Sequence, residues 1–342
     1  MLALRFHEFG GPDVLRLEQV PDPEPRAGEV VLRVSAAALN HLDVDIRSGL
    51  SRFPVPLPHT PGFEIVGRVV AVGDGIVDWT VGQRALCFFA SSCGRCRLCR
   101  AGQEALCPDL QFVSVAIPGG MSELFRCLAT QLLPLPDALD DVHAAAVMAA
   151  FGTSYHMLFT RAGLRAGERV LVTSVGSGIG SAAVQLARWA GAEVIGTASS
   201  AGKLEQARAL GMTHGIDYTT TDVVAEVLRL TGGEGVELAY EHAGGQRFAE
   251  ALGAIGKNGR VVTCGGHAGE VVDFDIVPFF RAQKTVIGSF CYSREEVLTC
   301  LELAARGVVE PQVHATFPLA EAAEAYALME RREHFGKLVV TP

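Results

Sequence analysis

Residues 170–183 read Val-Leu-Val-Thr-Ser-Val-Gly-Ser-Gly-Ile-Gly-Ser-Ala-Ala, a buried-strand run followed by a glycine-rich turn and the start of a helix. Glycines in such a turn let backbone N–H groups approach a pyrophosphate at a helix N-terminus, where the helix dipole favours negative charge. The strict G-x-G-x-x-G pattern fails, because Val175 and Ser177 occupy its first two positions when Gly180 occupies the last. An ordinary strand–turn–helix connection is the alternative interpretation. We predict a dinucleotide site whose turn contacts are Gly176, Ser177, Gly178, Ile179 and Gly180.

The segments around this turn alternate between strand and helix. Strands are expected at 169–174, 193–197, 236–240, 260–264 and 285–290, and helices at 181–190, 203–210, 223–230 and 247–255. This alternation predicts an α/β fold in which a doubly wound parallel sheet carries helices on both faces. A dinucleotide crosses such a sheet at the carboxyl ends of its strands, so further contacts are expected just after the later strands. These predicted contacts are Gly244, Gly265, Gly266 and Phe290.

The end of the second strand of this sheet indicates which dinucleotide fits. A site for NAD carries Asp or Glu there, which accepts a hydrogen bond from the ribose 2′-hydroxyl. Here the strand ends in Thr197 and Ala198, and no carboxylate follows before Glu205. Small hydroxyls with a cation suit a 2′-phosphate, so we predict NADP(H), with NAD as the alternative. The predicted contacts are Ser199, Ser200 and Lys203. Both serines are also good N-caps for the next helix, and the two roles are compatible.

The rest of the chain predicts a second domain that is rich in strands. Short strand patterns, as at 29–36 and 65–72, alternate with turns marked by Pro and Gly, and helical patterning begins near Asp141. We expect a mostly β domain at 1–148, the cofactor domain at 149–290, and a return to the first domain at 291–342. The last segment is expected to form helices at 295–306 and 319–331 and a strand at 335–341.

Four of the nine cysteines lie close together in a loop-like segment at 93–107. Cys93, Cys96, Cys99 and Cys107 have the spacing C-x₂-C-x₂-C-x₇-C, and four such thiolates can close a tetrahedron around one Zn²⁺. A closed site has no open position for substrate, so we expect a structural zinc that holds the loop together. Four unliganded thiols and a nucleic-acid-binding zinc ribbon are the alternatives.

Composition argues against several classes of partner. The chain has 38 acidic and 29 basic side chains, a net charge of −9, which disfavours binding to nucleic acid. No apolar stretch reaches the roughly 18 residues of a membrane span. The odd number of cysteines and the charged start of the sequence fit a reduced, cytoplasmic compartment. We therefore expect a cytoplasmic protein with a small-molecule substrate, and neither a nucleic-acid partner nor a membrane.

Together these motifs resemble the medium-chain dehydrogenase/reductase superfamily, also called the zinc-containing alcohol dehydrogenase family. The resemblance covers nearly the whole chain, and the cysteine spacing matches the family's structural zinc lobe residue for residue. It implies a GroES-like, mostly β catalytic domain, a Rossmann cofactor domain and oxidoreductase activity with a nicotinamide cofactor. The other matching motifs are Gly28–Val31, Leu39–Asp43, Pro61–Glu64, Gly176–Gly180, Gly265–Gly266 and Gly336–Val340.

The chain departs from those family members that oxidise alcohols with a second, catalytic zinc. The positions that match the three catalytic zinc ligands are Asn40, Phe63 and Ala149, and none of them is a good ligand. A catalytic zinc needs about three protein ligands, and Glu64 is the usual neighbour that remains. The resemblance therefore implies one zinc per chain, structural only, and it disfavours ordinary alcohol oxidation.

The same pattern is similar to the quinone oxidoreductase branch, which lacks catalytic zinc. Asn40 is typical of that branch, as are Lys203 and Tyr218, which there contact the 2′-phosphate of NADPH. The resemblance implies hydride transfer to quinones or α,β-unsaturated carbonyls, which need orientation and a hydrogen-bond donor but no metal. We expect Asn40 to position the substrate or the nicotinamide ribose. His41 is the candidate proton relay, with a packed or solvent-facing histidine as the alternative.

Two further groups of residues are expected to lie near the cofactor or the substrate. Asp43 and Lys337 resemble a family pair near the cofactor, and a plain surface salt bridge is the alternative. Aromatic residues are expected to wall an apolar pocket, although a core role is the alternative. These aromatic residues are Phe63, Phe88, Phe89 and Tyr292.

Two other functions remain open from the sequence. One is a zinc-dependent alcohol dehydrogenase with atypical ligands, and the other is an NADP(H)-binding protein with little turnover. The resemblance also implies pairing of subunits through the edge strand at 285–290, so we expect a homodimer or a homotetramer.

Overall fold

The computed structural model describes residues 1–342, which form two compact units. The β-rich unit comprises Met1–Met148, Ala304–Arg306 and Val313–Pro342. The parallel-sheet unit comprises Ala149–Leu303 and Gly307–Gln312. None of the helices is both long enough and apolar enough to cross a membrane.

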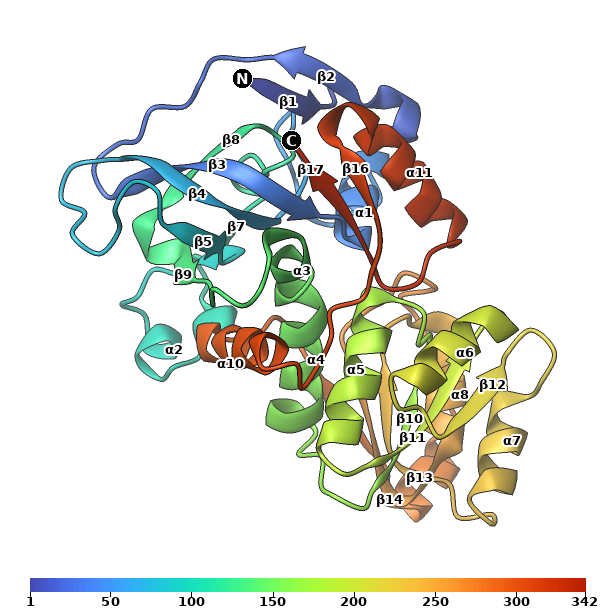
Figure 1. Cartoon of the computed structure of the whole chain (residues 1–342). Helices are drawn as coiled ribbons and strands as arrows, with labels where there is room; N and C mark the ends of the chain where they lie inside the picture. The colour runs from blue at the N-terminus through green and yellow to red at the C-terminus, as the bar shows by residue number, and fades with distance from the viewer. The chain divides into compact units, whose positions relative to one another are not determined.

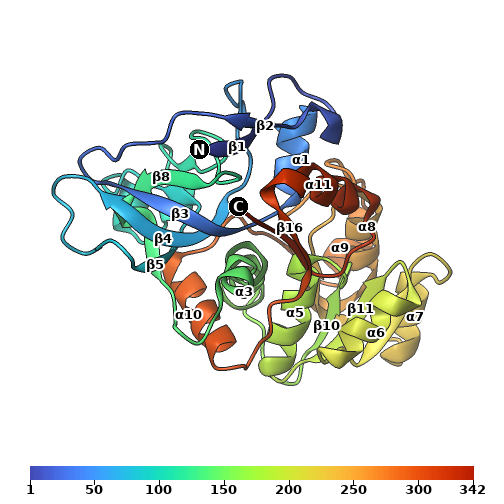
Figure 2. The same ribbon diagram turned by 45° about the horizontal axis from the view of Figure 1, so that its top comes forward.

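A seven-stranded sheet organises the β-rich unit, with the order β16-β17-β3-β4-β5-β9 and β8 paired to β3. Its strands are β3 (Glu29–Ala38), β4 (Glu64–Val72), β5 (Arg84–Cys87), β8 (Leu124–Leu128), β9 (Leu132–Pro134), β16 (Val313–Pro318) and β17 (Lys337–Thr341). β3, β4 and β5 run side by side in both views (Figures 1 and 2). The central strand β3 is buried along most of its length, because β4, β8 and β17 all pair with it.

Short elements complete the β-rich unit. Two small antiparallel pairs are formed by β1 (Leu2–Arg5) with β2 (Arg16–Gln19) and by β6 (Ala90–Ser91) with β7 (Gln111–Phe112). The helices are α1 (His41–Ser48), α2 (Arg97–Arg100), α3 (Asp141–Ala145) and α11 (Ala322–Arg331). α11 packs against β16 and β17, so the last segment of the chain completes this unit (Figure 1).

A six-stranded sheet organises the parallel-sheet unit, with the order β12-β11-β10-β13-β14-β15 and every pair parallel. Its strands are β10 (Arg169–Val172), β11 (Glu193–Ala198), β12 (His214–Asp217), β13 (Val236–Glu241), β14 (Ile255–Thr263) and β15 (Thr285–Gly288). This is the strand order of a doubly wound dinucleotide-binding fold, as the alternation of elements predicts. β12 was not among the predicted strands, because its four residues, His-Gly-Ile-Asp, show no alternating pattern.

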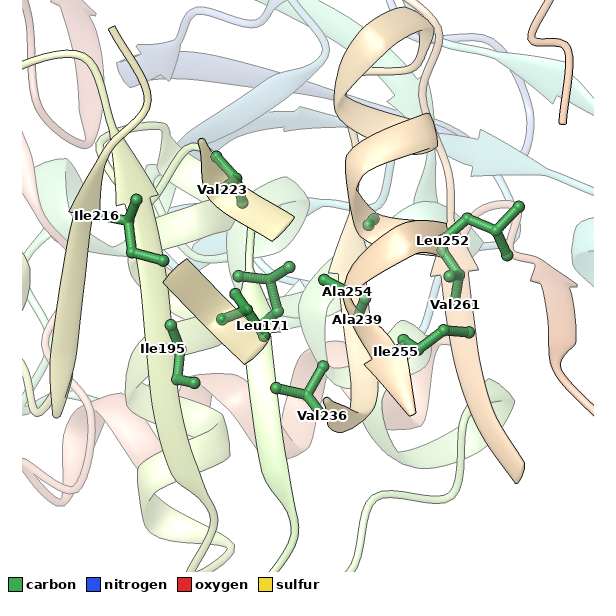
Figure 3. Packing of buried hydrophobic residues seen from close by; sticks show 12 residues of the cluster. Leu171, Ile195, Ile216, Val223, Val236, Ala239, Leu252, Ala254, Ile255 and Val261 are labelled. Atoms are coloured by element: carbon green, nitrogen blue, oxygen red, sulfur yellow. The ribbon is translucent and has the colours of Figure 1, made fainter. Parts of the chain in front are cut away.

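Helices cover both faces of this sheet. α5 (Gly178–Trp189) and α6 (Ala201–Ala209) connect β10, β11 and β12 on one face (Figure 1). α7 (Val223–Leu230) and α8 (Gly245–Ala254) contact each other on the opposite face. Leu171, Ile195 and Ile216, from three neighbouring strands, share one buried cluster with Val223 of α7 and Leu252 of α8 (Figure 3). Burying this apolar face stabilises the sheet by about 25 cal/mol per Å².

The remaining helical segments differ from the sequence-based expectation. The helical run that begins at Asp141 is not one regular helix, because π-helical turns at Met148–Gly152 and His156–Arg161 flank α4 (Thr153–Tyr155). α9 (Ile276–Arg281) precedes β15 and was not predicted.

The return to the first unit begins later than residue 291, where it was expected. α10 (Arg294–Ala305) belongs to the parallel-sheet unit up to Leu303. The buried carboxylate of Glu296 anchors it there, because it accepts hydrogen bonds from His156 Nδ1 at 2.9 Å and from the Thr160 hydroxyl. The amide of Gln185 likewise bonds both backbone groups of Glu310 and fastens the segment 307–312 to this unit.

Candidate functional site

The glycine-rich turn lies between β10 and α5. Ser177 is the N-cap of α5, and its hydroxyl accepts a hydrogen bond from the Gly180 N–H at 2.9 Å. A Cβ on Gly180 would lie 2.3 Å from the Ser174 carbonyl oxygen, so this position requires glycine. The backbone N–H groups at the start of α5 therefore lie in a close-packed turn at a helix N-terminus, the arrangement that accommodates a pyrophosphate.

The loop after β13 lies beside this turn. His242 Nε2 is hydrogen-bonded to the Ser177 hydroxyl at 2.9 Å, so it joins the two loops at the carboxyl edge of the sheet. The buried carboxylate of Glu241 accepts hydrogen bonds from the N–H groups of Ala243 and Gly244 and from the Thr263 hydroxyl. The sequence analysis assigned a role to neither residue, although Glu241 directly follows the strand predicted at 236–240 and His242 is the next residue.

The predicted glycines after β13 and β14 have a steric reason to be glycine. Gly244 has a φ of 79° and bridges to Gly269, which favours a residue without a side chain. A Cβ on Gly265 would lie 2.1 Å from the His242 carbonyl oxygen. Gly266 follows in the same loop, and Phe290 follows β15 with 49% of its side chain exposed.

The residues predicted for a 2′-phosphate gather at the end of β11. Ser200 is the N-cap of α6 and accepts from the Lys203 N–H at 3.4 Å, so the capping alternative is correct for this serine. The Lys203 side chain passes over the glycine-rich turn. It comes so close that a Cβ on Gly176 would lie 2.8 Å from the Lys203 Cδ. The Tyr218 N–H donates to the Ala198 carbonyl at 3.1 Å, next to Ser199. These groups fit a dinucleotide with a 2′-phosphate, and no acidic residue lies directly after β11.

A second group of polar residues lies in the β-rich unit, where β3, β4 and β17 meet. Asn40 follows β3, Glu64 begins β4 and Lys337 begins β17. The pairing of Ala38 with both Glu64 and Val339 brings these three positions together. Lys337 Nζ donates to Glu64 Oε2 at 2.5 Å, to Asn40 Oδ1 at 2.7 Å and to the Leu39 carbonyl at 2.7 Å. The ammonium therefore uses all three of its donors inside the protein.

This network fixes the orientation of the Asn40 side chain. Its Nδ2 donates to Glu64 Oε2 at 2.9 Å and to the Ala38 carbonyl at 3.3 Å, while its Oδ1 accepts from Lys337. Both amide N–H groups are thus used, and a lone pair on Oδ1 is the capacity that remains. Asn40 can accept a hydrogen bond from a ligand, but it has no donor left for a substrate oxyanion.

Asp43 supports the same corner of the unit. Its carboxylate accepts from the N–H groups of Asn40 at 2.9 Å and Gly62 at 3.0 Å. Burial raises the pKa of Asp43 to about 6, although these two hydrogen bonds and the Lys337 charge act to lower it. Lys337 pairs directly with Glu64 rather than with Asp43, and its side chain is 7% exposed, so a plain surface salt bridge is not what the structure shows.

The positions that match a catalytic zinc do not fit that metal. Phe63 has no ligand atom, Ala149 has none, and the Asn40 amide is already engaged on both sides. The Lys337 ammonium also neutralises Glu64, the carboxylate that would otherwise attract a cation. The side chains at these positions therefore do not form a donor set for zinc.

Phe63 belongs to a group of aromatic side chains that meet at Phe89. Its ring centroid lies 6.2 Å from that of Phe89, which contacts Phe88 at 4.8 Å and Phe112 at 5.6 Å. Phe63, Phe88 and Phe89 are all buried. Tyr292 belongs instead to the parallel-sheet unit, where its ring lies against Gly152. Phe112 was not among the predicted aromatic residues.

His41, the predicted proton relay, is the first residue of α1 and is half-buried. It follows Asn40 directly in the chain. Its catalytic role stays a prediction.

The four clustered cysteines meet in the segment between β6 and β7. The ligand atoms of Cys93, Cys96, Cys99 and Cys107 all lie within 4.8 Å of one another. Cys96 Sγ lies 3.4 Å from Cys99 Sγ and 4.0 Å from Cys107 Sγ. Tetrahedral Zn–S bonds of about 2.3 Å require sulfurs roughly 3.8 Å apart, so the cluster fits one zinc ion.

Comparison with known proteins agrees with this architecture. Residues 26–137 match the family model of the alcohol dehydrogenase GroES-like domain, and residues 178–306 match that of the zinc-binding dehydrogenases. The chain is 32% identical to a 2-haloacrylate reductase from a Burkholderia species, over 100% of this chain and 99% of that protein. It is 30% identical to a quinone oxidoreductase from Pseudomonas aeruginosa, over 99% of each. A crystal structure of an NAD-dependent alcohol dehydrogenase superposes with a TM-score of 0.94 and 37% identity, over 100% of both chains.

The β-rich unit is thus a GroES-like domain, and the parallel-sheet unit is a Rossmann domain with a glycine-rich turn. The chain belongs to the medium-chain dehydrogenase/reductase superfamily and is an NAD(P)H-dependent oxidoreductase.

Proposed function

We propose that this oxidoreductase uses NADPH to reduce quinones or α,β-unsaturated carbonyl compounds, without a catalytic metal. The observation that carries the proposal is the Lys337–Glu64–Asn40 network. It places an ammonium ion against Asn40, a position that the family resemblance matches to a catalytic zinc ligand, and against its neighbour Glu64. A protein without a Lewis acid there has no partner for an alkoxide, whereas an electron-poor double bond accepts hydride without one.

Three features support NADPH as the cofactor. Ser199 and Ser200 follow β11 in place of an acidic residue, and Lys203 crosses the glycine-rich turn. Tyr218 is fixed beside them through its backbone. When bound, NADPH supplies the hydride, and the protein supplies its orientation. Ser177 and the N–H groups of α5 would hold the pyrophosphate, and Lys203 would pair with the 2′-phosphate.

The residues of the β-rich unit have separate tasks in this proposal. Asn40 accepts a hydrogen bond from the nicotinamide ribose or the substrate through the free lone pair of Oδ1, while Lys337 and Glu64 prevent its amide from turning. Because Asn40 has no donor left, the proton that completes reduction comes from another group. We assign this task to His41, the half-buried histidine next to Asn40.

Names of relatives favour this substrate class. One similar protein is named a 2-haloacrylate reductase and another a quinone oxidoreductase, and both names describe reduction of an electron-poor acceptor. The protein in the similar crystal structure is named an NAD-dependent alcohol dehydrogenase, so alcohol oxidation is the alternative to test.

Steady-state NADPH oxidation at 340 nm tests the proposal. The purified protein is assayed with a quinone and an enone as acceptors, and in the reverse sense with NADP⁺ and primary and secondary alcohols. Elemental analysis of the same sample measures zinc. We expect turnover with quinone or enone and one zinc per chain. Two zinc ions per chain with alcohol oxidation contradict the proposal, and tight NADPH binding without turnover indicates a binding protein instead.

We also propose a homodimer or homotetramer that pairs through the parallel sheet. β15 is an edge strand, and α9 beside it carries exposed apolar side chains. Ile276 is 57% exposed, Phe280 58% and Phe290 49%. Exposed apolar residues grouped along an unpaired strand edge favour contact with a second copy.

A reducing, cytoplasmic location is supported by the nine cysteines, none of which forms a disulfide.

A further inference from the structure

Arg247, in the first turn of α8, lies over the ring of Tyr218. The guanidinium carbon is 4.4 Å from the ring centroid, a distance typical of a cation–π contact. A planar guanidinium held against an aromatic ring loses little freedom when it then binds a phosphate. Tyr218 is one of the residues proposed to contact the adenosine 2′-phosphate, so Arg247 lies next to the proposed phosphate site.

Arg247 lies at the same edge of the sheet as the other cofactor residues. α8 begins at Gly245, four residues after the end of β13, and Arg247 is its third residue. Tyr218 follows β12 and is bonded through its backbone to Ala198 at the end of β11. Because β11, β12 and β13 run parallel within one sheet, the residues that follow them share its carboxyl edge.

Arg247 keeps hydrogen-bonding capacity that the protein does not use. Its Nη1 lies 2.7 Å from Glu250 Oε2, yet this buried nitrogen has no aligned hydrogen-bond partner. Arg229 on the neighbouring helix α7 shows what a satisfied pair looks like. Its Nε and Nη2 donate to the two oxygens of Glu226 at 2.8 and 2.7 Å. Arg247 is therefore ion-paired with Glu250 without an aligned hydrogen bond, so the protein does not saturate the donors of its guanidinium.

We propose that Arg247 is a specificity-determining residue that binds the adenosine 2′-phosphate of the cofactor, together with Lys203. This inference rests on the proposed use of NADPH. Lys203 reaches the site from α6 over the glycine-rich turn, and Arg247 reaches it from α8 over Tyr218. The two cations come from helices on opposite faces of the sheet, so a phosphate at its edge would be held from both sides. Nothing in the sequence pattern indicated this role, because Arg247 stands within a predicted helix.

Binding of two nucleotide fragments tests the assignment. Adenosine 2′,5′-bisphosphate carries the 2′-phosphate and adenosine 5′-monophosphate lacks it, and calorimetry measures the affinity of each without any turnover. The variant is R247M, and the matched control is R229M, which removes an arginine with the same spacing to a glutamate on the adjacent helix. R247K keeps the charge but not the planar donor. Thermal melting of each variant verifies that it is folded.

We expect R247M to weaken binding of the bisphosphate about tenfold to a hundredfold, the range for a lost charge-assisted hydrogen bond, while the monophosphate changes less than threefold. R247K is expected to lie between, and R229M to match the wild type. An equal loss for both fragments, or no loss for either, overturns the role of Arg247. If the wild type itself binds the two fragments equally, the proposed preference for NADPH fails, whatever the variants do.

Discussion

Lys337 holds together the polar corner of the GroES-like domain, which consists of Asn40, Asp43, Glu64 and Lys337. In the Lys337→Met variant the Glu64 carboxylate, which is fully buried, loses its counter-charge. We expect a loss of about 3–5 kcal/mol in the free energy of unfolding, because an uncompensated buried charge remains. Urea denaturation measures this loss.

The double variant K337M/E64Q is the control for that prediction. It removes both charges and leaves an amide that can still accept from Asn40 Nδ2, so it should recover a large part of the lost stability. If the double variant is as unstable as the sum of the two single variants, Lys337 and Glu64 are not coupled.

His59 gives the fold a dependence on pH. Its ring is 2% exposed and its Nε2 lies 3.1 Å from the Ser114 carbonyl, and burial lowers the pKa of His59 to about 4. The unfolded chain therefore binds a proton between about pH 6.5 and 4 that the folded chain does not, and stability falls as pH falls through this window. The shift corresponds to about 3 kcal/mol.

Asp43 acts in the opposite direction over part of the same window. Since burial raises the pKa of Asp43 to about 6, the folded chain binds the extra proton there, and that contribution to stability is lost as pH rises through 6. The two effects partly cancel in the wild type, so the test compares the free energy of unfolding of the His59→Gln variant with that of the wild type. Between pH 7 and 4, His59→Gln should lose less of this free energy than the wild type, as measured by urea denaturation at each pH. Parallel plots of unfolding free energy against pH would show that His59 is not the titrating group.

The strand–turn–helix element around the glycine-rich turn is rigid because of steric contacts. In Gly180→Ala the new Cβ would lie 2.3 Å from the Ser174 oxygen and 2.9 Å from the Ser177 hydroxyl. We expect a loss of about 1–3 kcal/mol, as for other overpacked sites, together with weaker NADPH binding. Thermal melting and fluorescence titration with NADPH measure both effects.

Gly202→Ala is the matched control, because a Cβ on this glycine of α6 meets nothing within 4 Å. Alanine there should stabilise the helix by about 0.5–1 kcal/mol and leave NADPH affinity unchanged. Equal losses in the two variants would mean that the crowding at Gly180 has no special effect.

Most elements of the parallel sheet could be predicted from local sequence, and the misses have physical reasons. The bounds of β11, β13 and α7 agree with the predicted ones to within one residue. Each of these elements has a strand or helix pattern that is complete within its own residues. β12 is recognisable only through its pairing with β11, since a four-residue strand has no period of its own. The cysteine cluster was predictable because its four members lie within fifteen residues.

The polar corner was predictable only in part. Asn40 and Glu64 were expected near a site by resemblance, but their bonds to Lys337 join residues 297 and 273 positions apart. No local pattern encodes such a contact, because it arises from the register of β3 with β4 and β17. Arg247 was missed for the same reason, since its contact with Tyr218 joins a helix to a loop after another strand.

The exposed apolar side chains of α9 and β15 predict that the protein associates with itself. Phe280→Asp places a charge in this group, and we expect it to shift the protein from dimer or tetramer toward monomer, because burying an unpaired charge opposes association. Light scattering coupled to size-exclusion chromatography measures the mass. Val77→Asp, at a side chain 87% exposed in the GroES-like domain, is the control and should leave the mass unchanged. A monomeric wild type would refute the proposed pairing.

The late position of β17 in the chain has a consequence for biosynthesis. Asn40 and Glu64 leave the ribosome early, whereas their cationic partner is translated 297 residues after the former. Until then the nascent first domain lacks the Lys337 ammonium that pairs with Glu64, and its central strand β3 lacks one of its three partner strands. Ribosome-bound intermediates stalled before residue 337 should therefore be sensitive to proteases and dependent on chaperones, and the domain should close only when this last strand docks.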